Sequence, residues 1–197
     1  MTNCLMHASR ALTAQGANRM NTSRRGLANL AIFAAAKRLA QSQDLLSTPA
    51  KTAIIDDAGA HSYADLLCDA RKVRAALGNK DHLGASIAML MPNSYEYAAV
   101  QWGIWAAGGA VVPLSPMHPE RELEYFLSNS DARYLICHPV LLSNVQPVLD
   151  RLGSSLQVIM SDSIMAMAHV ESADDVAIDE NQSALFIYTS GTTGKPK

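Results

Sequence analysis

The residues best suited to chemistry form the string Thr189–Lys197, which reads Thr-Ser-Gly-Thr-Thr-Gly-Lys-Pro-Lys. Its glycines let backbone N–H groups approach a ligand closely, while its hydroxyl and ammonium groups add hydrogen-bond donors and positive charge. The apolar run Ala184–Tyr188 stands directly before it and predicts a buried strand. A strand that leads into a Gly-, Thr- and Lys-rich loop is typical of a polyphosphate site. A polar surface loop is the alternative, and the complete string favours the phosphate site.

This string differs from a Walker A loop. That motif has four residues between its glycines and a Ser or Thr directly after its Lys. Here two residues separate Gly191 from Gly194, and Pro196 follows Lys195. Proline also removes a backbone N–H that a helix start would direct at phosphate. We therefore expect a phosphate loop of another kind.

Tyr188–Lys197 resembles the phosphate-binding motif of the AMP-forming adenylate ligases, the acyl-CoA synthetase superfamily. The family motif Tyr-Thr-Ser-Gly-Thr-Thr-Gly-x-Pro-Lys is matched at every fixed position. The resemblance extends over roughly residues 30–197 through further blocks: Tyr63–Leu66, Met91–Ser94, Trp105–Leu114 and Glu122–Tyr125. The passage Pro113–Pro119 with the last of these blocks is most similar to the malonyl-CoA synthetase branch, whose mitochondrial members carry an N-terminal presequence.

The resemblance implies a two-step reaction. A carboxylate attacks the α-phosphorus of ATP and pyrophosphate leaves, and the acyl-adenylate is then captured by the thiol of coenzyme A. It implies that ATP and Mg²⁺ are held near the loop, with these binding residues: Thr189, Ser190, Gly191, Thr192, Thr193, Gly194, Lys195 and Lys197. Lys195 stands at the variable position of the motif, so the resemblance assigns the charge-neutralising role more firmly to Lys197. It gives no catalytic residue and no metal ligand within the chain.

Two segments are expected from these observations. The remaining family features, which include the acyl pocket and the C-terminal lid, have no match up to Lys197. We therefore expect residues 41–197 to be the N-terminal part of an adenylate-forming domain, inactive by itself. Residues 1–40 are expected to be a mitochondrial transit peptide, because the first 43 residues carry six basic residues and no acidic one. A disordered upstream extension is the alternative.

The rest of the composition excludes several classes of protein. Beyond residue 43 there are ten basic and 18 acidic residues, which argues against nucleic acid as a partner. No apolar run is long enough to span a membrane. The three cysteines and six histidines show neither metal-ligand spacing nor a disulfide framework, and no Ser/His/Asp or Cys/His arrangement is visible. Cys68 and Cys137 fall in apolar patterns and are expected to be buried.

Strand and helix patterns alternate along the chain, which predicts an α/β fold with a parallel sheet and helices on both faces. A hairpin is expected over 52–63, and a helix over 28–40. Further helices are expected after Ser62 and over 95–107, 120–129 and 141–152, the last interrupted by Pro147. Strands are expected over 86–91, 110–114, 131–137 and 156–160, and a loop or short helix over 161–181. Ligands of such sheets bind beyond the carboxyl ends of the strands.

Three side chains have two interpretations each. Trp102 and Trp105 are spaced for stacking on a ligand, although core packing is the favoured interpretation. His138 follows a predicted strand and is favoured as a hydrogen-bonded loop residue over a residue that lines a site.

The function expected is that of an ATP-dependent acid–CoA ligase, with malonate as the favoured acid and the mitochondrial matrix as the favoured location. Alternatives are a cytoplasmic location, another acyl-, aryl- or amino-acid-activating enzyme of the superfamily, and a non-catalytic truncated isoform. The oligomeric state is left open.

Overall fold

The computed structural model describes residues 51–78, 82–170 and 182–189. Its strands are β1 (Thr52–Asp56), β2 (Gly59–Ser62), β3 (Ser86–Leu90), β4 (Ala110–Leu114), β5 (Tyr134–Cys137) and β6 (Gln157–Met160). Its α-helices are α2 (Tyr63–Ala76), α3 (Tyr95–Ala106), α4 (Glu120–Asn129), α5 (Leu142–Leu152) and α6 (Ser161–Met165). Two 3-10 turns, η1 (Pro139–Leu141) and η2 (Gly153–Ser155), flank α5. The helix expected over 28–40 and the expected leader lie outside the described residues.

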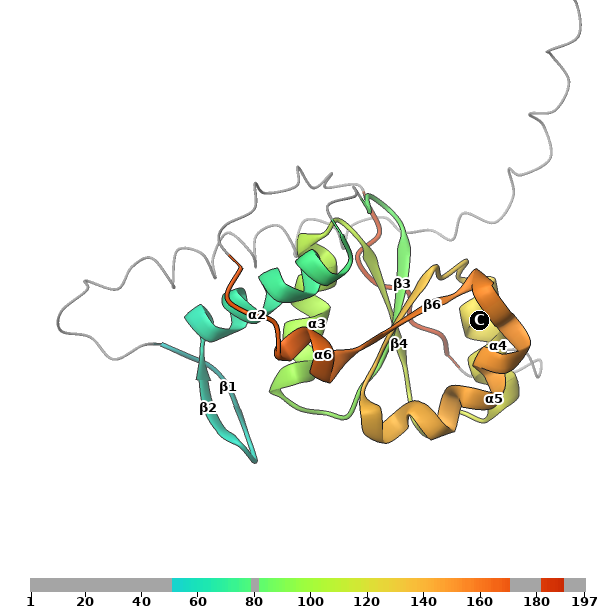
Figure 1. Ribbon diagram of the computed structural model, residues 1–197, viewed down its shortest axis with the longest axis horizontal. Coiled ribbons are helices and arrows are strands. Elements are labelled where there is room, and N and C mark those ends of the chain that lie inside the picture. Colours follow the sequence, from blue (N-terminus) through green and yellow to red (C-terminus); the bar gives the residue numbers. More distant parts are fainter. Residues whose placement is uncertain (1–50, 79–81, 171–181, 190–197) are drawn as a thin grey trace, which may run out of the picture.

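Four strands form a parallel sheet in the order β4-β3-β5-β6 (Figure 1). The chain moves from β3 to β4 on one side and then crosses to β5 on the other side of β3. All four residues from Ile87 to Leu90 are fully buried in this central strand. A strand buried on both faces needs a continuous apolar sequence, which is what the run at 86–91 predicted. The predicted parallel α/β fold is confirmed.

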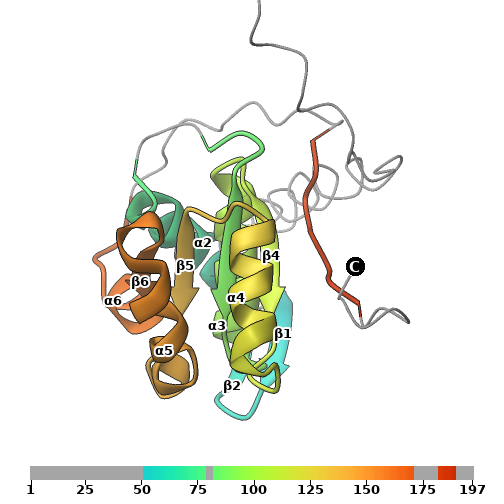
Figure 2. The ribbon, with the colours of Figure 1, turned by 90° about the vertical axis from the view of Figure 1, so that its right-hand side faces the viewer.

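Side chains alternate between the two faces of this sheet because successive residues of a strand point in opposite directions. Ile87 and Met89 face one core, which is completed mainly by residues of α2, α3 and α6. Ala88 and Leu90 face the other core, which is completed by α4 and α5. Figure 2 shows α4 and α5 on one side of the sheet and α2 and α3 on the other. Both faces are covered, so the sheet sits between two helical layers.

Helices α2 and α3 cross at close range. A Cβ atom added to Gly103 would lie 2.3 Å from Val73 Cβ and 2.7 Å from the carbonyl oxygen of Ala70. The missing side chain therefore lets the two backbones approach each other. Neither neighbour is the flexible end of a side chain, so no larger residue fits there without moving a helix.

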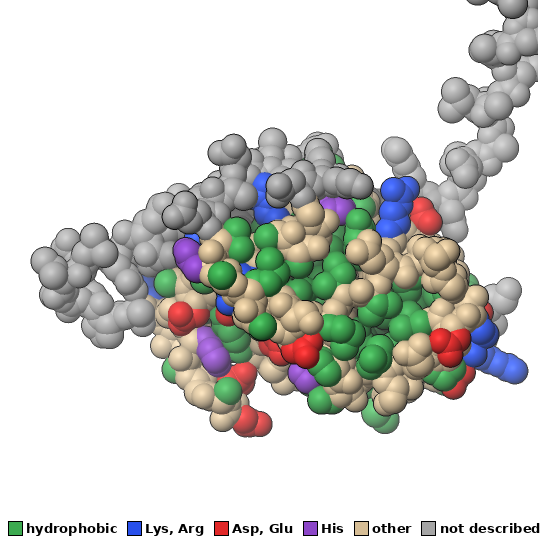
Figure 3. All heavy atoms as spheres, in the orientation of Figure 1, with side chains coloured by type: hydrophobic (Ala, Val, Ile, Leu, Met, Phe, Trp, Pro, Cys, Tyr) green, Lys and Arg blue, Asp and Glu red, His purple; other side chains and the backbone are tan. Residues whose placement is uncertain are grey.

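The β1–β2 hairpin stands beside these helices as a separate two-stranded sheet. Figure 3 shows acidic and histidine side chains gathered over its surface. Asp56 connects it to the main body, because its Oδ2 accepts a hydrogen bond of 2.7 Å from the backbone N–H of Tyr95 at the start of α3. Its Oδ1 lies 3.1 Å from His61 Nε2, and the His61 ring stacks on the ring of Tyr95 with centroids 3.9 Å apart.

Pro147 was expected to kink or split its helix. It does not split it, because α5 continues through this residue. Val145 and Val148, on either side of Pro147, are both buried in the core, and this packing holds the helix together where proline removes one hydrogen bond. Pro119 is the N-cap of α4 and has extended backbone angles.

Candidate functional site

Residues 182–189 lead to the predicted phosphate loop and lie alongside β4 (Figure 2). The backbone N–H of Val111 donates to the carbonyl of Ala184 at 2.9 Å, and the N–H of Phe186 donates to the carbonyl of Val111 at 2.8 Å. The indole N–H of Trp105 also donates to the Ala184 carbonyl at 2.8 Å. These bonds fix the segment parallel to β4, with an isolated bridge between Val111 and Leu185. It therefore runs toward the edge of the sheet at which the parallel strands end.

The expectation of a buried strand over Ala184–Tyr188 is wrong. Leu185 is 37% exposed and Ile187 is 58% exposed, and a single bridge joins the segment to β4. Phe186 and Tyr188 pack instead against the core beneath α4. This alternation arises because α4 covers one face of the segment, and no described element covers the other.

Tyr188 fixes the direction in which the chain leaves the sheet. Its ring stacks on Phe126 of α4, with centroids 4.4 Å apart, and its hydroxyl donates a 2.9 Å hydrogen bond to Asn129 Oδ1. Burial raises the pKa of the Tyr188 hydroxyl, so it remains protonated and can donate that bond at neutral pH. Thr189, which follows, is exposed. The two ends of the apolar segment, at Ala184 and Tyr188, are therefore both anchored to neighbouring helices.

Of the predicted phosphate-binding residues, Thr189 alone falls within the described residues. Ser190, Gly191, Thr192, Thr193, Gly194, Lys195 and Lys197 lie outside them. The structure describes residues 182–189, which lead to the loop, and the phosphate-binding role of the loop residues stays a prediction.

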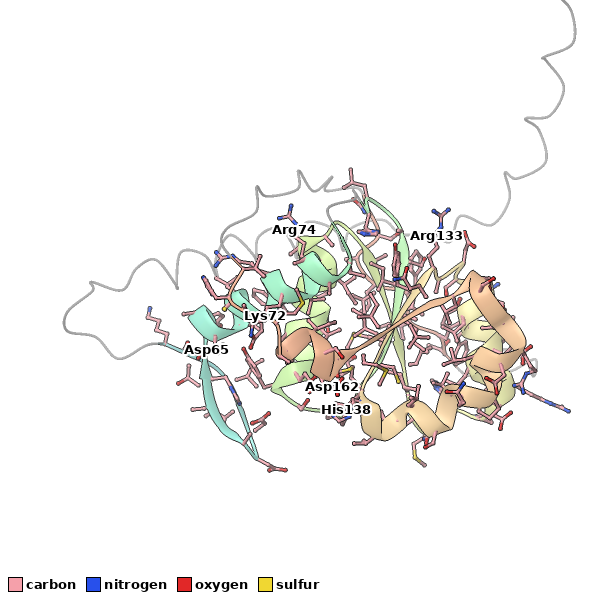
Figure 4. The ribbon with its side chains drawn as sticks, viewed as in Figure 1. Asp65, Lys72, Arg74, Arg133, His138 and Asp162 are labelled. Carbon is pink, nitrogen blue, oxygen red and sulfur yellow. The ribbon has the colours of Figure 1, made fainter. Side chains whose placement is uncertain are left out.

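A second group of polar side chains lies at the edge where the parallel strands end. His138 and Ser161 stand one position beyond Cys137 and Met160, which pair in the register of β5 and β6. By alternation both belong to the face covered by α3, and His138 Nε2 lies 3.6 Å from Oε2 of Glu96 on that helix. Figure 4 shows His138 near Asp162, the residue after Ser161.

Hydrogen bonding indicates which tautomer the His138 ring adopts. Its Nδ1 accepts a bond of 3.3 Å from the backbone N–H of Val140 and so caps the turn η1. A neutral ring that accepts at Nδ1 carries its proton at Nε2, which faces Glu96. The prediction of a hydrogen-bonded loop histidine is confirmed. The buried atoms Glu96 Oε1 and Ser161 Oγ have no hydrogen-bond partner among the described residues.

The tryptophans occupy the positions that core packing requires. Trp105 is 9% exposed and belongs to the core between the sheet and α3, and Trp102 packs against the same core. The prediction of core packing is confirmed. The sequence did not show that the indole of Trp105 would also hold the segment before the phosphate loop, because its partner Ala184 is distant in sequence.

The two described cysteines differ. Cys137 is fully buried, as predicted, and burial raises the pKa of its thiol to about 11. Cys68 is only half-buried, and its Sγ lies 3.1 Å from His169 Nδ1. The expectation that it is a buried apolar residue is wrong, and the sequence missed this cysteine–histidine pair because 101 positions separate its members.

Among residues 51–78, 82–170 and 182–189, no group of three or more His, Cys, Asp or Glu side chains is placed to hold a metal ion.

None of the helices in these described ranges has the length and apolar character needed to cross a bilayer.

A Gly-, Thr- and Lys-rich sequence follows a segment that lies parallel to the outer strand of the sheet, and ligands of parallel α/β sheets bind beyond the carboxyl ends of the strands. The sequence matches the family described as AMP-binding enzyme over residues 42–197. The chain belongs to this family.

Relatives of the chain include mitochondrial malonate–CoA ligases and a syringomycin synthase. The chain is 33% identical over 159 residues to the mitochondrial malonate–CoA ligase ACSF3 of Mus musculus, covering 75% of this chain and 27% of that ligase. The Homo sapiens ligase of the same name is 31% identical over 157 residues. Syringomycin synthase SyrB1 of Pseudomonas syringae pv. syringae is 33% identical over 152 residues, covering 76% of this chain and 24% of the synthase. The chain thus spans about a quarter of the length of these curated relatives.

Solved structures show the same fold. The N-terminal subdomain of NpsA from Klebsiella oxytoca superposes with a TM-score of 0.67 at 27% identity, covering 82% of this chain and 39% of that one. ATP-bound MatB from Rhodopseudomonas palustris superposes with a TM-score of 0.63 at 27% identity, covering 82% of this chain and 34% of that one. The described α/β unit therefore corresponds to the N-terminal portion of adenylate-forming enzymes.

Proposed function

We propose that the whole protein containing this chain is an ATP-dependent acid–CoA ligase that activates malonate. The observation that carries the proposal is the string Thr189–Lys197, which directly follows a segment aligned parallel to β4. The mitochondrial malonate–CoA ligases among the relatives favour malonate. The chemistry is formation of an acyl-adenylate with loss of pyrophosphate, followed by transfer of the acyl group to coenzyme A.

In this proposal the loop holds the β- and γ-phosphates of ATP. Backbone N–H groups around Gly191 and Gly194 approach the phosphates, and the hydroxyls donate hydrogen bonds to them; these belong to Thr189, Ser190, Thr192 and Thr193. Lys195 and Lys197 offset the negative charge that grows on the departing pyrophosphate. Mg²⁺, when bound, would neutralise further phosphate charge, and no described residue is assigned to it.

The anchors of residues 184–188 hold the entry to the proposed phosphate loop in one place. A phosphate loop acts by fixed position and charge, so its entry must be held before the nucleotide binds. Trp105 and Val111 hold one end of the segment at Ala184, and Asn129 and Phe126 hold the other at Tyr188. The chain thus provides a supported entry to the loop.

The first prediction tests the phosphate role in the complete polypeptide. Lys197→Ala should slow malonate-dependent exchange of pyrophosphate into ATP by roughly 10²–10³-fold, because it removes a preorganised charge from the leaving group. Thr189→Ala should have a smaller effect, about 1.5 to 3 kcal/mol, which is typical of a hydrogen bond to a charged group. Thioester formation from pre-made malonyl-adenylate should be unaffected by either change, since pyrophosphate has already left.

Trp102→Phe is the control, because a core residue should alter stability and leave the ratio of the two half-reactions unchanged. Equal slowing of both half-reactions by Lys197→Ala would refute the phosphate role.

A second candidate function within the family is activation of an amino acid or aryl acid. The solved structures of VinN in complex with L-aspartate and of the NpsA N-terminal subdomain in complex with 3-hydroxybenzoyl-AMSN favour it, since they are 28% and 26% identical to this chain and each match covers 82% of it. The same exchange assay with a panel of acids separates the two. Exchange that depends on an amino acid and ignores malonate would replace the first proposal, and an absence of exchange with every acid would favour a non-catalytic isoform.

A further inference from the structure

Residues 165–169 are attached to helix α2 by two side chains that stand one helical turn apart. Lys72 Nζ donates a 3.1 Å hydrogen bond to the carbonyl of Met165, and it pairs with Asp69 Oδ1 at 3.0 Å. Cys68 Sγ lies 3.1 Å from His169 Nδ1. Figure 4 shows Lys72 on the side of α2 that faces α6. Lys72 therefore holds the start of this segment, and Cys68 holds its end.

The Cys68–His169 pair brings together a nucleophile and a base at a position open to solvent. His169 is exposed and Cys68 is half-buried, so a small reagent can reach the sulfur. A thiol becomes nucleophilic when a nearby base removes its proton, and a sulfur–nitrogen contact of this length allows that transfer. Cys137 offers an internal comparison, because it is fully buried and pairs with no base in the described part of the chain.

We propose that Cys68 is a site of modification by low-molecular-weight disulfides, with His169 as its base. Nδ1 of His169 takes the thiol proton, and the Cys68 sulfur attacks one sulfur of a disulfide R–S–S–R. A new Cys68–S–S–R bond forms while the original S–S bond breaks. The departing thiolate receives the proton and leaves as R–SH, so the exchange balances without another oxidant.

Modification removes the Cys68 contact of the segment, whereas the packing of Met165 and Met167 against the core is unaffected. The mixed disulfide has no S–H to donate to His169, and the added group occupies the space between the two side chains. The bond from Lys72 to Met165 remains, so residues near 169 are released while α6 stays in place. In sequence this stretch lies between α6 and the strand-like segment that approaches the phosphate loop.

The test measures modification at Cys68 in the complete polypeptide. Protein is treated with 5,5′-dithiobis(2-nitrobenzoic acid) or with glutathione disulfide, and each cysteine is followed by peptide mass spectrometry. Cys68 should react faster in the native protein than in the urea-unfolded protein, whereas Cys137 should react only after unfolding. His169→Asn should slow native Cys68 modification by about tenfold or more, since it removes the base.

Ala168→Asn is the matched control, because it places the same side chain one position earlier at an exposed site. It should leave the rate unchanged. Native modification no faster than in the unfolded chain would overturn the proposal, as would equal rates for the His169→Asn and Ala168→Asn proteins. A further check is hydrogen exchange near residue 169, which should rise after modification and return to its starting value when a reductant removes the added group.

Discussion

At the scale of single residues, Asp56 connects the hairpin to the sheet domain through a charge. Its carboxylate caps the first turn of α3 from a distant strand by accepting the Tyr95 N–H bond, which is the main reason that its pKa lies below the usual value of 3.8. The second cause is the hydrogen bond to His61. A helix N-terminus favours negative charge, and the Asp56 carboxylate of the hairpin places such a charge at the first turn of α3.

The second prediction concerns the pH dependence of this bond. A group whose folded pKa is depressed contributes stability that is complete above its unfolded pKa and is lost as pH falls through the folded value. Asp56→Ala should therefore lower the free energy of unfolding at pH 7, and the difference from wild type should shrink below about pH 4. Denaturant unfolding at several pH values measures it. Asp57→Ala, at the exposed tip of the hairpin, should show no comparable pH-dependent loss.

Prediction of single residues from sequence succeeded where the partners are close along the chain. A helix was predicted directly after Ser62, a residue type that caps helices, and its partner Asp65 lies three positions away, within the first helical turn. The Asp56–Tyr95 bond, the Trp105–Ala184 bond and the Cys68–His169 pair join residues from different elements. No local pattern encodes them, because they depend on how the helices and strands are placed in the fold.

At the scale of elements, the start of α2 is a reciprocal cap. Ser62 Oγ accepts a 3.2 Å bond from the backbone N–H of Asp65, and Asp65 Oδ2 accepts a 2.9 Å bond from the backbone N–H of Ser62. The hydroxyl and the backbone N–H of Ser62 are the main causes that lower the pKa of Asp65. Two backbone donors that the helix leaves unpaired are satisfied in this way.

The third prediction measures this cap. Ser62→Ala should destabilise the fold by about 1 kcal/mol, which is typical for loss of an N-cap side chain. Thermal or denaturant unfolding would detect it. Ser128→Ala, at an exposed position inside α4, should change stability by no more than about 0.5 kcal/mol. If Ser62→Ala and Ser128→Ala lowered the free energy of unfolding equally, the hydrogen bonds of the cap would contribute no stability.

The elements themselves were largely predictable. The sequence pattern gave the bounds of α4 and β4 and came within a few residues for the other described strands and for α2, α3 and α5, whereas for α6 it indicated only a loop or short helix over 161–181. The failures have physical causes. Pro147 is tolerated because core packing on both sides outweighs one lost hydrogen bond, and the apolar run 184–188 is half exposed because α4 covers only one of its faces. Pattern alone gives the type of an element, and burial depends on its neighbours.

At the scale of the whole molecule, charge is unequally distributed along the sequence: the first 43 residues carry six basic and no acidic residues, and the rest carries ten basic and 18 acidic residues. The fourth prediction is that Met1–Ala40 fused to a fluorescent protein is imported into mitochondria, because its basic, acid-free composition is that of a transit peptide. Microscopy with a mitochondrial marker measures it. Replacing Arg10, Arg19, Arg24 and Arg25 with glutamine should reduce import, and a diffuse cytosolic signal from the unmodified fusion would refute the targeting role.

The central place of β3 has a consequence for the order in which the chain folds. Its pairing with β4 closes a shorter loop than its pairing with β5, and β6 can be added only after β5 is in place. Loop closure costs entropy before its contacts form, so the rate-limiting nucleus should contain β3 with β4. The fifth prediction follows: Val111→Ala should mainly slow refolding, whereas Ile159→Ala on β6 should mainly accelerate unfolding. Stopped-flow kinetics would distinguish them, and the reverse assignment would place the nucleus at the other side of the sheet.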